Sequence, residues 1–409
     1  MQNTVVIVGA GQTAAQAVDS LRRGGFDGRL VVVGAEPTPP YQRPPLSKKF
    51  LAGELPAERL AIKPAAFYAQ ANVELKLGRS ATALECAARE LTLSDGERLG
   101  YQRLLLATGT EPRRLAVPGA ALAGIHYLRT LADVERIRAA LSTGARVVVV
   151  GGGYIGLEVA ATCRGLGHEV EVIEMTERLM NRVVAPAVSA FYHDEHRRAG
   201  VALHLNALVA EFRPSAASAT QVGAVATADG REFPADVVVV GIGVVPVTAL
   251  AAAAGLACDD GIAVDEYCQS SDPSVYAAGD CCSFPSLRYG RRIRLESVDN
   301  AFEQAKTAAA NLAGQRLAHD RVPWFWSDQY DLKLMIVGLN RSHDQVVLRG
   351  NPAERAFSCC YLKDGELLAV DCVNNAKDYM AARKLIAERA RLDPARLSDA
   401  TLPLRDCVV

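Results

Sequence analysis

Short apolar runs that end in small residues recur through the first three quarters of the chain. Unbroken runs of this kind are typical of strands buried in a parallel sheet. We predict such strands at Thr4–Val8, 30–33, 104–110, Arg146–Val150, 170–173 and 235–240, with a helix at about 13–23. The alternation of strand and helix indicates an α/β fold.

The pattern changes after about Trp324. Apolar and polar residues then alternate over several short runs, which predicts an antiparallel sheet, and one amphipathic helix is predicted at about 376–390. At 409 residues the chain is too long for one ordinary core. The C-terminal quarter therefore reads as a further domain.

Two glycine turns, each between an apolar strand and a helix, carry the clearest chemistry. They match a G-x-G-x-x-G/A pattern through Gly9, Gly11 and Ala14, and again through Gly151, Gly153 and Gly156. The first position makes the tight turn, the second lets the backbone approach a pyrophosphate, and the third lets helix pack on strand. The helix N-terminus then points its N–H groups at the phosphates. Two such turns predict a protein that passes electrons between two dinucleotides.

An acid follows the second strand of each unit, at Glu36 and Glu174. Such a carboxylate accepts hydrogen bonds from ribose hydroxyls. Glu174 would repel a 2′-phosphate, and Arg178 alone gives weak support for one, so we favour NADH over NADPH. The alternative is that Glu174 is a surface glutamate in a strand-end turn.

The overall charge is nearly balanced. Net charge is −1, from 45 basic and 46 acidic residues, so nothing global suggests nucleic acid or a membrane as partner. The sequence shows no basic leader and no apolar run of about 18 or more residues. We expect a cytoplasmic protein.

Cysteine spacing argues against thiol chemistry. The ten cysteines show neither C-x-x-C nor zinc-like spacing, and we expect buried thiols in a reducing compartment. A disulfide reductase would need a paired dithiol beside its flavin. An NADH oxidase or peroxidase would need a reactive cysteine, expected at about 41–48, and that segment has none.

Three further segments place polar groups in turns. In PYQRPPLSKKF, residues 40–50, the prolines predict an extended path that presents Arg43 and Lys48, and the alternative is a solvated loop. GIGVVP, residues 241–246, follows a buried strand. The Gly279-Asp280 turn of VYAAGDCC is suited to place a carboxylate and backbone amides near a ribityl chain.

The two glycine turns, PPLSK, ATGT, GGGYIGLE, YAAGD and WFWSDQY occur in this order, and together the chain resembles the flavin-dependent, NADH-linked ferredoxin reductases of bacterial cytochrome P450 and Rieske dioxygenase systems. The resemblance extends over essentially the whole chain. It implies a glutathione-reductase-like fold with two Rossmann-type dinucleotide-binding domains and a C-terminal α+β domain. The FAD domain would comprise 1–110 and 241–320, the NADH domain 111–240, and the C-terminal domain 321–409.

The resemblance also implies which residues contact the cofactors. Those expected at FAD are Gly9, Gly11, Thr13, Ala14, Glu36, Arg43, Lys48, Ala81, Ala107, Thr108, Gly109, Arg129, Asp280, Val298 and Trp326. Those expected at NADH are Gly151, Gly153, Tyr154, Ile155, Gly156, Glu174 and Gly243. The family usually carries its first ribose-binding acid at the position of Ala35, whereas here the acid is Glu36.

Lys48 and Glu158 are expected to form a catalytic pair near the flavin N5. A cation there would favour the anionic reduced flavin, and the carboxylate would hold the lysine in place. The alternative is that Glu158 is a helix-start carboxylate favoured by the helix dipole.

The resemblance predicts that a hydride passes from NADH to FAD, and that single electrons pass on to an acidic [2Fe–2S] ferredoxin. The ferredoxin would feed a cytochrome P450 or a Rieske-type oxygenase. A locally basic docking face is expected, with Arg288, Arg291, Arg292 and Arg294 as the densest cationic run and Lys306, Lys333, Arg383 and Lys384 as further candidates. A rubredoxin reductase and a non-enzymatic NADH-sensing flavoprotein stay open as alternatives.

Overall fold

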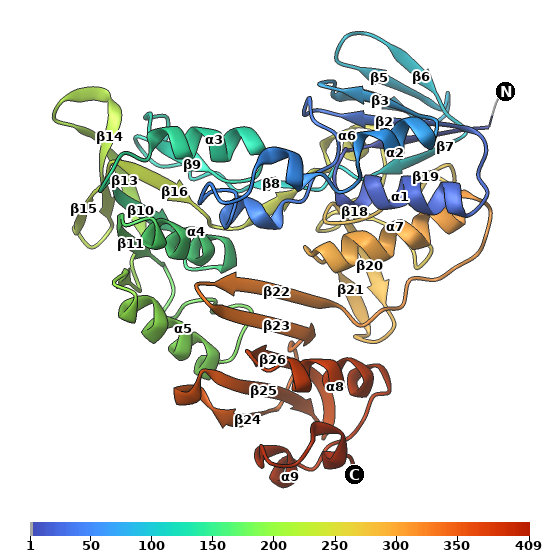
Figure 1. Cartoon of the computed structure of the whole chain (residues 1–409). Helices are drawn as coiled ribbons and strands as arrows, with labels where there is room; N and C mark the ends of the chain where they lie inside the picture. Colours follow the sequence, from blue (N-terminus) through green and yellow to red (C-terminus); the bar gives the residue numbers. More distant parts are fainter. Residues whose placement is uncertain (1–2) are drawn as a thin grey trace. The chain divides into compact units, whose positions relative to one another are not determined.

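The computed structural model describes residues 3–409, and for residue 65 the backbone alone. The chain divides into two compact units (Figure 1). Unit 1 contains the chain up to residue 42, residues 58–111 and residues 244–321. Unit 2 contains residues 43–57, 112–243 and 322–409. The chain therefore passes from one unit to the other several times.

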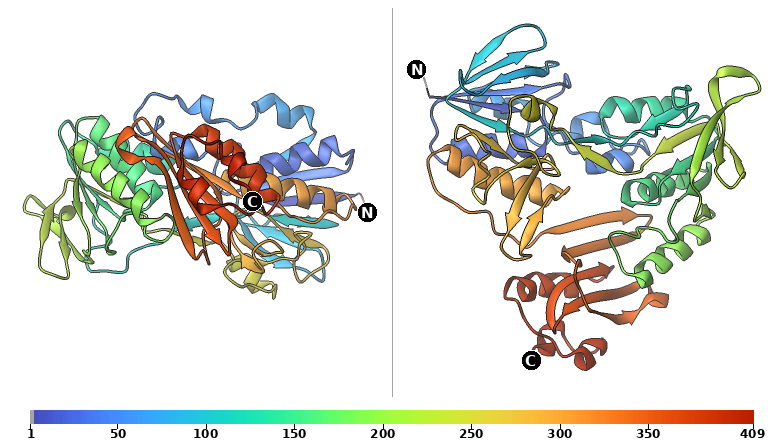
Figure 2. Two further views of the ribbon diagram at one scale, coloured as in Figure 1. Left: turned by 90° about the horizontal axis from the view of Figure 1, so that it is seen from below. Right: turned by 180° about the vertical axis from the view of Figure 1, so that it is seen from behind.

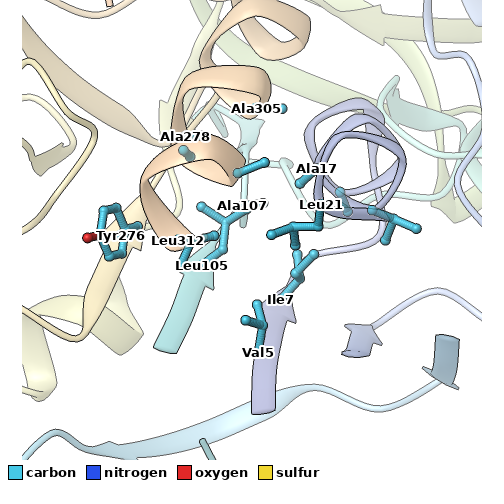
Figure 3. Close-up of a cluster of buried hydrophobic side chains, with 14 of the residues drawn as sticks. Val5, Ile7, Ala17, Leu21, Leu105, Ala107, Tyr276, Ala278, Ala305 and Leu312 are labelled. Atoms are coloured by element: carbon cyan, nitrogen blue, oxygen red, sulfur yellow. The ribbon is translucent and has the colours of Figure 1, made fainter. Parts of the chain in front are cut away.

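The main sheet of unit 1 has five parallel strands in the order β19-β7-β1-β2-β3. Their bounds are β19 Val275–Ala277, β7 Arg103–Leu106, β1 Thr4–Val8, β2 Arg29–Gly34 and β3 Val73–Leu77. Helices α1 (Gln12–Arg23) and α7 (Val298–Leu312) pack against each other, and their apolar side chains meet those of β1 and β7 in one buried cluster (Figure 3). This core fixes the turn that joins β1 to α1.

Smaller elements complete unit 1. An antiparallel sheet contains β4 (Ala81–Glu85), β5 (Glu90–Leu93) and β6 (Arg98–Gly100). A second small sheet contains β18 (Ile262–Ala263), β20 (Cys282–Ser286) and β21 (Arg291–Ile293). The helices α2 (Ala65–Gln70) and α6 (Ala249–Ala253) are short, as is the strand β17 (Val244–Pro246). The short strand β8 (Thr110–Pro112) begins in unit 1 and ends at the first residue of the next segment of unit 2.

Unit 2 contains a second five-stranded parallel sheet, in the order β12-β11-β10-β16-β9. Its strands are β12 Ala202–His204, β11 Glu169–Ile173, β10 Arg146–Val150, β16 Val237–Val240 and β9 Ile125–Tyr127. The accompanying helices are α3 (Leu131–Ala140), α4 (Tyr154–Gly165) and α5 (Pro186–Arg198). A three-stranded sheet of β13 (Val209–Ser215), β14 (Ser218–Thr227) and β15 (Glu232–Pro234) follows.

The C-terminal part of unit 2 is an antiparallel sheet in the order β22-β23-β26-β25-β24. Its strands are β22 Trp324–Gln329, β23 Leu332–Gly338, β24 Gln345–Asn351, β25 Ala356–Lys363 and β26 Glu366–Val373. Helix α8 (Ala376–Ala387) lies beside β26 and β23, and α9 (Pro394–Ser398) follows it (Figure 2). The predicted antiparallel sheet and helix are confirmed, as is the α/β class with two parallel sheets.

The prediction for the proline segment was wrong. Instead of an extended path, Pro44–Ser47 forms a 3₁₀ helix, and Leu46 and Ser47 are buried. Prolines at the first helical positions lose no hydrogen bond, and their fixed φ suits a helix start. Since Leu46 is fully buried, the segment is also not the solvated loop of the alternative. Across residues 3–409, no helix is both long and apolar enough to cross a membrane.

Candidate functional site

In unit 1, β1 turns into α1 through Gly9 and Gly11. Gly9 has a φ of 114°, and a Cβ there would lie 2.1 Å from the carbonyl oxygen of Ala107, so the protein's own packing requires glycine. Gly11 is the N-cap of α1, and a Cβ there would meet no atom of the described residues within 4 Å. Over residues 3–409, no side chain caps this helix. The open glycine and the uncapped N–H groups fit a phosphate close to the backbone.

Other predicted FAD residues gather at the carboxyl edge of the same sheet. A Cβ on Gly279 would lie 2.4 Å from Thr13 Oγ1, so α1 and the turn after β19 are in close contact. Asp280 Oδ2 lies 3.5 Å from Thr110 Oγ1. The hydroxyl of Thr108 donates to the carbonyl of Val247 at 2.7 Å. The Gly279-Asp280 turn thus lies beside the first glycine turn.

Sequence reasoning missed Gln304, which holds this turn in place. The Gln304 side chain is fully buried in α7, and its Oε1 accepts a hydrogen bond from Gly279 N at 2.8 Å. The same oxygen accepts from Asn300 Nδ2 at 3.1 Å. Val298 is the first residue of α7, and Ser297 caps the helix. A polar side chain on the buried face of a predicted helix is the signal that could have identified Gln304.

Glu36 and Ala35 differ in burial. Ala35 is exposed, whereas Glu36 is half-buried and its Oε2 accepts a hydrogen bond from Tyr41 OH at 2.6 Å. The carboxylate is therefore held near the end of β2. Its contact with the ribose stays a prediction.

In unit 2, the second glycine turn resembles the first. Some of its glycines are required by close packing, and one has open space at its Cβ position. Gly151 has a φ of 108°, and a Cβ there would lie 2.4 Å from Gly241 O. A Cβ on Gly156 would lie 2.1 Å from Gly151 O. Gly153 is the N-cap of α4, and a Cβ on it would meet no atom of residues 3–409 within 4 Å. The packing of the protein therefore does not require glycine at the second position of either turn.

Glu174 directly follows β11 and ties the glycine turn to the strand end. Its Oε2 accepts a hydrogen bond from Gly152 N at 2.7 Å, and its Oε1 accepts from Thr176 N at 2.8 Å. Arg178 donates to the carbonyls of Val184 and Asn181, so its guanidinium is engaged within the loop. This arrangement gives no support for a 2′-phosphate site.

Lys48 and Glu158 lie in contact within unit 2. Lys48 Nζ is 2.7 Å from Glu158 Oε2, and the glutamate side chain is nearly fully buried. Ser47 Oγ also donates to Oε2, at 2.6 Å, and Ser327 Oγ donates to Oε1 at 2.7 Å. The helix-start interpretation of Glu158 was wrong, because α4 begins at Tyr154 and its first turn contains no acid. Sequence reasoning missed both serines.

Three more predicted residues of unit 2, Arg43, Arg129 and Tyr154, have defined contacts. Arg43 donates to the carbonyl of Arg129 at 2.6 Å, so two predicted FAD residues lie together. The Tyr154 ring packs on Phe325, with centroids 4.8 Å apart, and burial raises the pKa of Tyr154. Ile155, next in α4, is exposed at the glycine turn.

Comparisons with known proteins agree with this arrangement. The family described as pyridine nucleotide-disulphide oxidoreductase matches residues 3–309, and a reductase C-terminal domain matches residues 324–408. The ferredoxin reductase subunit of 5,5'-dehydrodivanillate O-demethylase from Sphingobium sp. is 44% identical over 402 residues, which cover 98% of this chain and 97% of that protein. The chain belongs to the ferredoxin reductases of the pyridine nucleotide-disulphide oxidoreductase family.

Solved structures of such reductases share the fold. Putidaredoxin reductase of Pseudomonas putida, seen in its covalent complex with putidaredoxin, is 42% identical, with a TM-score of 0.96 over 99% of this chain and 98% of that one. The ferredoxin reductase of the CYP199A2 system from Rhodopseudomonas palustris is 41% identical, with a TM-score of 0.95 over the full length of both chains. The predicted family and the glutathione-reductase-like fold class are confirmed.

Two arginines of the predicted cationic run of this reductase are engaged by other groups of the protein. Arg292 donates to the carbonyls of Val264 and Ser283. Arg294 is mostly buried and pairs with Asp260 and Glu296. The two carboxylates offset the charge of Arg294, whereas Arg292 donates to neutral carbonyls. The role of the run in docking stays a prediction.

Among the ten thiols of the reductase, Cys258 is exposed, Cys86 is half-buried and the others are buried. All ten are free. Burial raises the pKa of both Cys86 and Cys258, which makes each a poor nucleophile at neutral pH. The prediction of buried thiols thus holds for all but these two. Over the described residues, no group of His, Cys, Asp and Glu side chains could hold a metal ion.

Proposed function

We propose that this protein takes electrons from NADH through FAD and delivers them one at a time to a [2Fe–2S] ferredoxin, which feeds a cytochrome P450 or a Rieske-type oxygenase. The observation that carries the proposal is the pair of glycine turns. In each turn, the second glycine lies at a helix N-terminus that no side chain of the described residues caps. A Cβ on this glycine would meet no described atom within 4 Å. Glycine there is explained by a ligand that approaches the backbone.

In this proposal, the turn at Gly9 and Gly11 holds the FAD pyrophosphate through the N–H groups of α1. Asp280 faces the ribityl or phosphate portion, and Glu36 contacts the adenosine ribose. The other predicted contacts are Thr13, Ala14, Arg43, Ala81, Ala107, Thr108, Gly109, Arg129, Val298 and Trp326. When bound, FAD supplies the conversion between a two-electron donor and a one-electron acceptor.

We assign NADH to the turn from Gly151 to Gly156, with Tyr154, Ile155 and Gly243 beside it. Glu174 would accept hydrogen bonds from the ribose with the acceptor capacity left over from its contacts with Gly152 N and with the N–H and hydroxyl of Thr176. The same carboxylate would repel a 2′-phosphate. Arg178 is already engaged by backbone carbonyls, which supports the choice of NADH.

Lys48 and Glu158 are proposed to act together beside the flavin. The ammonium favours negative charge on the reduced ring, and the carboxylate keeps the ammonium in place. Glu158 has the burial and the three donors needed for that task. Neither residue needs to act as a nucleophile.

The four-segment division is proposed on the same grounds, with FAD bound by 1–110 and 241–320, NADH by 111–240, and 321–409 as the C-terminal domain. We further propose that the protein works in the cytoplasm. Ten thiols without a disulfide support a reducing compartment.

The experiment that tests the function is anaerobic reduction of a purified [2Fe–2S] ferredoxin by the FAD-loaded protein and NADH, followed by cluster absorbance. NADPH in place of NADH is the matched control. We expect fast reduction with NADH and a rate at least about tenfold lower with NADPH. The rate should fall as ionic strength rises, because a charge-steered encounter is screened.

Two outcomes would overturn the proposal at different steps. A flavin that NADH does not reduce would remove the NADH assignment. A flavin that NADH reduces but that passes nothing to several [2Fe–2S] ferredoxins would remove the acceptor, and rubredoxin would be tested next.

A further inference from the structure

A continuous row of buried polar side chains leads away from Glu158 within unit 2. Ser327 and Gln329 lie on one face of β22, opposite the face that carries Trp324 and Trp326 toward Tyr379 of α8. Ser327 Oγ contacts Glu158 Oε1 at 2.7 Å, and Gln329 Nε2 lies 3.2 Å from Ser327 Oγ.

The row continues through His196 of α5 to the turn between β22 and β23. His196 Nε2 lies 2.9 Å from Gln329 Oε1, and Tyr330 OH lies 2.9 Å from His196 Nδ1. Ser327, Gln329 and His196 are all at most 1% exposed. The bonds that join Glu158, Ser327, Gln329 and His196 are therefore shielded from water, whereas the bond from Tyr330 is only partly buried.

Chemistry fixes the direction of every bond in the row. The carboxylate can only accept, so the Ser327 hydroxyl donates to it, and the Gln329 amide N–H donates to Ser327. Gln329 Oε1 can only accept, so His196 Nε2 carries a proton. His196 Nδ1 is then the acceptor of the Tyr330 hydroxyl. Burial lowers the pKa of His196 to about 4, which agrees with a neutral ring.

The backbone of Tyr330 has an unfavourable conformation in the turn between β22 and β23. Its φ of 56° lies in the left-handed region, which costs a non-glycine residue roughly 1 kcal/mol or more. The ring of Tyr330 lies over His196, with centroids 5.0 Å apart. The strained turn thus brings the last donor of the row onto the imidazole.

We propose that Tyr330, His196, Gln329 and Ser327 are positioning residues, which hold the Glu158 carboxylate through a one-way chain of hydrogen bonds that all donate toward it. Each bond polarises the next, so aligned donors strengthen the last one on the carboxylate. With Ser47 on the other oxygen, the chain fixes the orientation of Glu158 and so the place of the Lys48 ammonium. The consequence for catalysis rests on the proposed function of that pair.

The first test is the protonation of His196 in the FAD-loaded protein at neutral pH. Long-range proton–nitrogen correlation spectra of the histidine-labelled protein, assigned with His196→Gln, report which ring nitrogen carries the proton. We expect a neutral ring protonated at Nε2. A ring protonated at Nδ1 alone would reverse the chain, and a ring protonated at both nitrogens would reverse the bond from Tyr330. Either result would overturn the proposal.

The second test is a double-mutant cycle on anaerobic flavin reduction by NADH. We expect Gln329→Leu to slow the reduction about tenfold and to change the dissociation constant of NADH less than about twofold. In a Glu158→Gln background the same substitution should add little, because the chain acts through the carboxylate. Asp328→Asn, on the opposite face of the same strand, is the matched control and should keep the parent rate.

If Gln329→Leu slowed flavin reduction equally in both backgrounds, Gln329 would not act through Glu158, and the proposal would be overturned. Ser327→Ala serves the same cycle if Gln329→Leu does not fold. A flavin that NADH does not reduce at all would overturn the proposed function, whereas the tautomer of His196 still decides the chain.

Discussion

Asp371 is a buried carboxyl group that forms no salt bridge among the residues the structure describes. It lies on β26 with no exposed surface, and Tyr361 of β25 donates a hydrogen bond to it. The Tyr361 hydroxyl in turn accepts from Ala185 N at 2.6 Å, at the start of α5. Burial raises the pKa of Asp371 to about 7, although the bond from Tyr361 opposes the rise.

This pKa predicts a pH-dependent stability. In the unfolded chain an aspartate titrates near pH ~4, so between pH ~4 and ~7 the folded state binds the additional proton. The free energy of unfolding therefore falls as pH rises through this window. Asp371→Asn removes this titration. As pH rises from ~5 to ~8, the free energy of unfolding of the variant should therefore increase by roughly 2 kcal/mol relative to that of the parent. Urea unfolding of both FAD-loaded proteins measures this, and a difference independent of pH would contradict it.

Sequence reasoning identified single residues only where a motif or the family resemblance carried them. Lys48 and Glu158 were identified from the resemblance. Ser47 and Ser327 were not, because they meet Glu158 from segments far away in the sequence, and a lone serine has no pattern. The alternation of β22 could have shown that Ser327 is a polar residue on a buried face.

At the scale of elements, apolar patterning predicted the strands closely. In Arg146–Val150, the four valines that follow the exposed Arg146 are buried in a parallel sheet, and an unbroken apolar run indicates such burial. The segment Pro44–Ser47 was mispredicted because proline excludes the helix interior but not its first turn. The tertiary packing of Leu46 decided the conformation there.

The second glycine turn offers a matched pair of substitutions. Gly153→Ala adds a methyl group with no atom within 4 Å in the described part of the chain, at a φ of −83° that alanine adopts freely. We expect parent-like stability and a KM for NADH at least about tenfold higher, because the methyl group enters the space assigned to the pyrophosphate. Steady-state kinetics with NADH and a thermal unfolding scan measure both effects.

Gly156→Ala is the control within the same helix. Its methyl group would lie 2.1 Å from Gly151 O, so the helix must move away from the strand. This variant should lose stability, by roughly 1–3 kcal/mol. If Gly153→Ala destabilised the protein as strongly as Gly156→Ala, the open glycine would be a packing residue and the argument for a ligand would fail.

At the scale of the whole molecule, the balanced charge and the scattered cysteines argue against some classes of function but do not identify the reaction or the partner. A net charge of −1 leaves docking of an acidic partner to a local patch. Sequence could predict that a basic run exists but not that Arg292 and Arg294 are engaged within unit 1, because Arg292 donates to carbonyls of other segments and Arg294 pairs with the distant Asp260 as well as with the nearby Glu296. The identity of the docking residues therefore depends on tertiary contacts.

The family description names disulphides, but the burial of the thiols in this chain predicts that no thiol or disulphide takes part in its reaction. Cys258 is exposed and Cys86 half-buried, so we expect an aromatic disulfide reagent to modify at most these two thiols in the native protein and all ten after denaturation. Since burial raises the pKa of both, modification should be slow. Reduction of a ferredoxin by NADH should stay unchanged after alkylation, because electron transfer through FAD needs no thiol. Activity lost in step with modification of one cysteine would instead indicate a thiol in the reaction, and Cys258→Ser would then identify it.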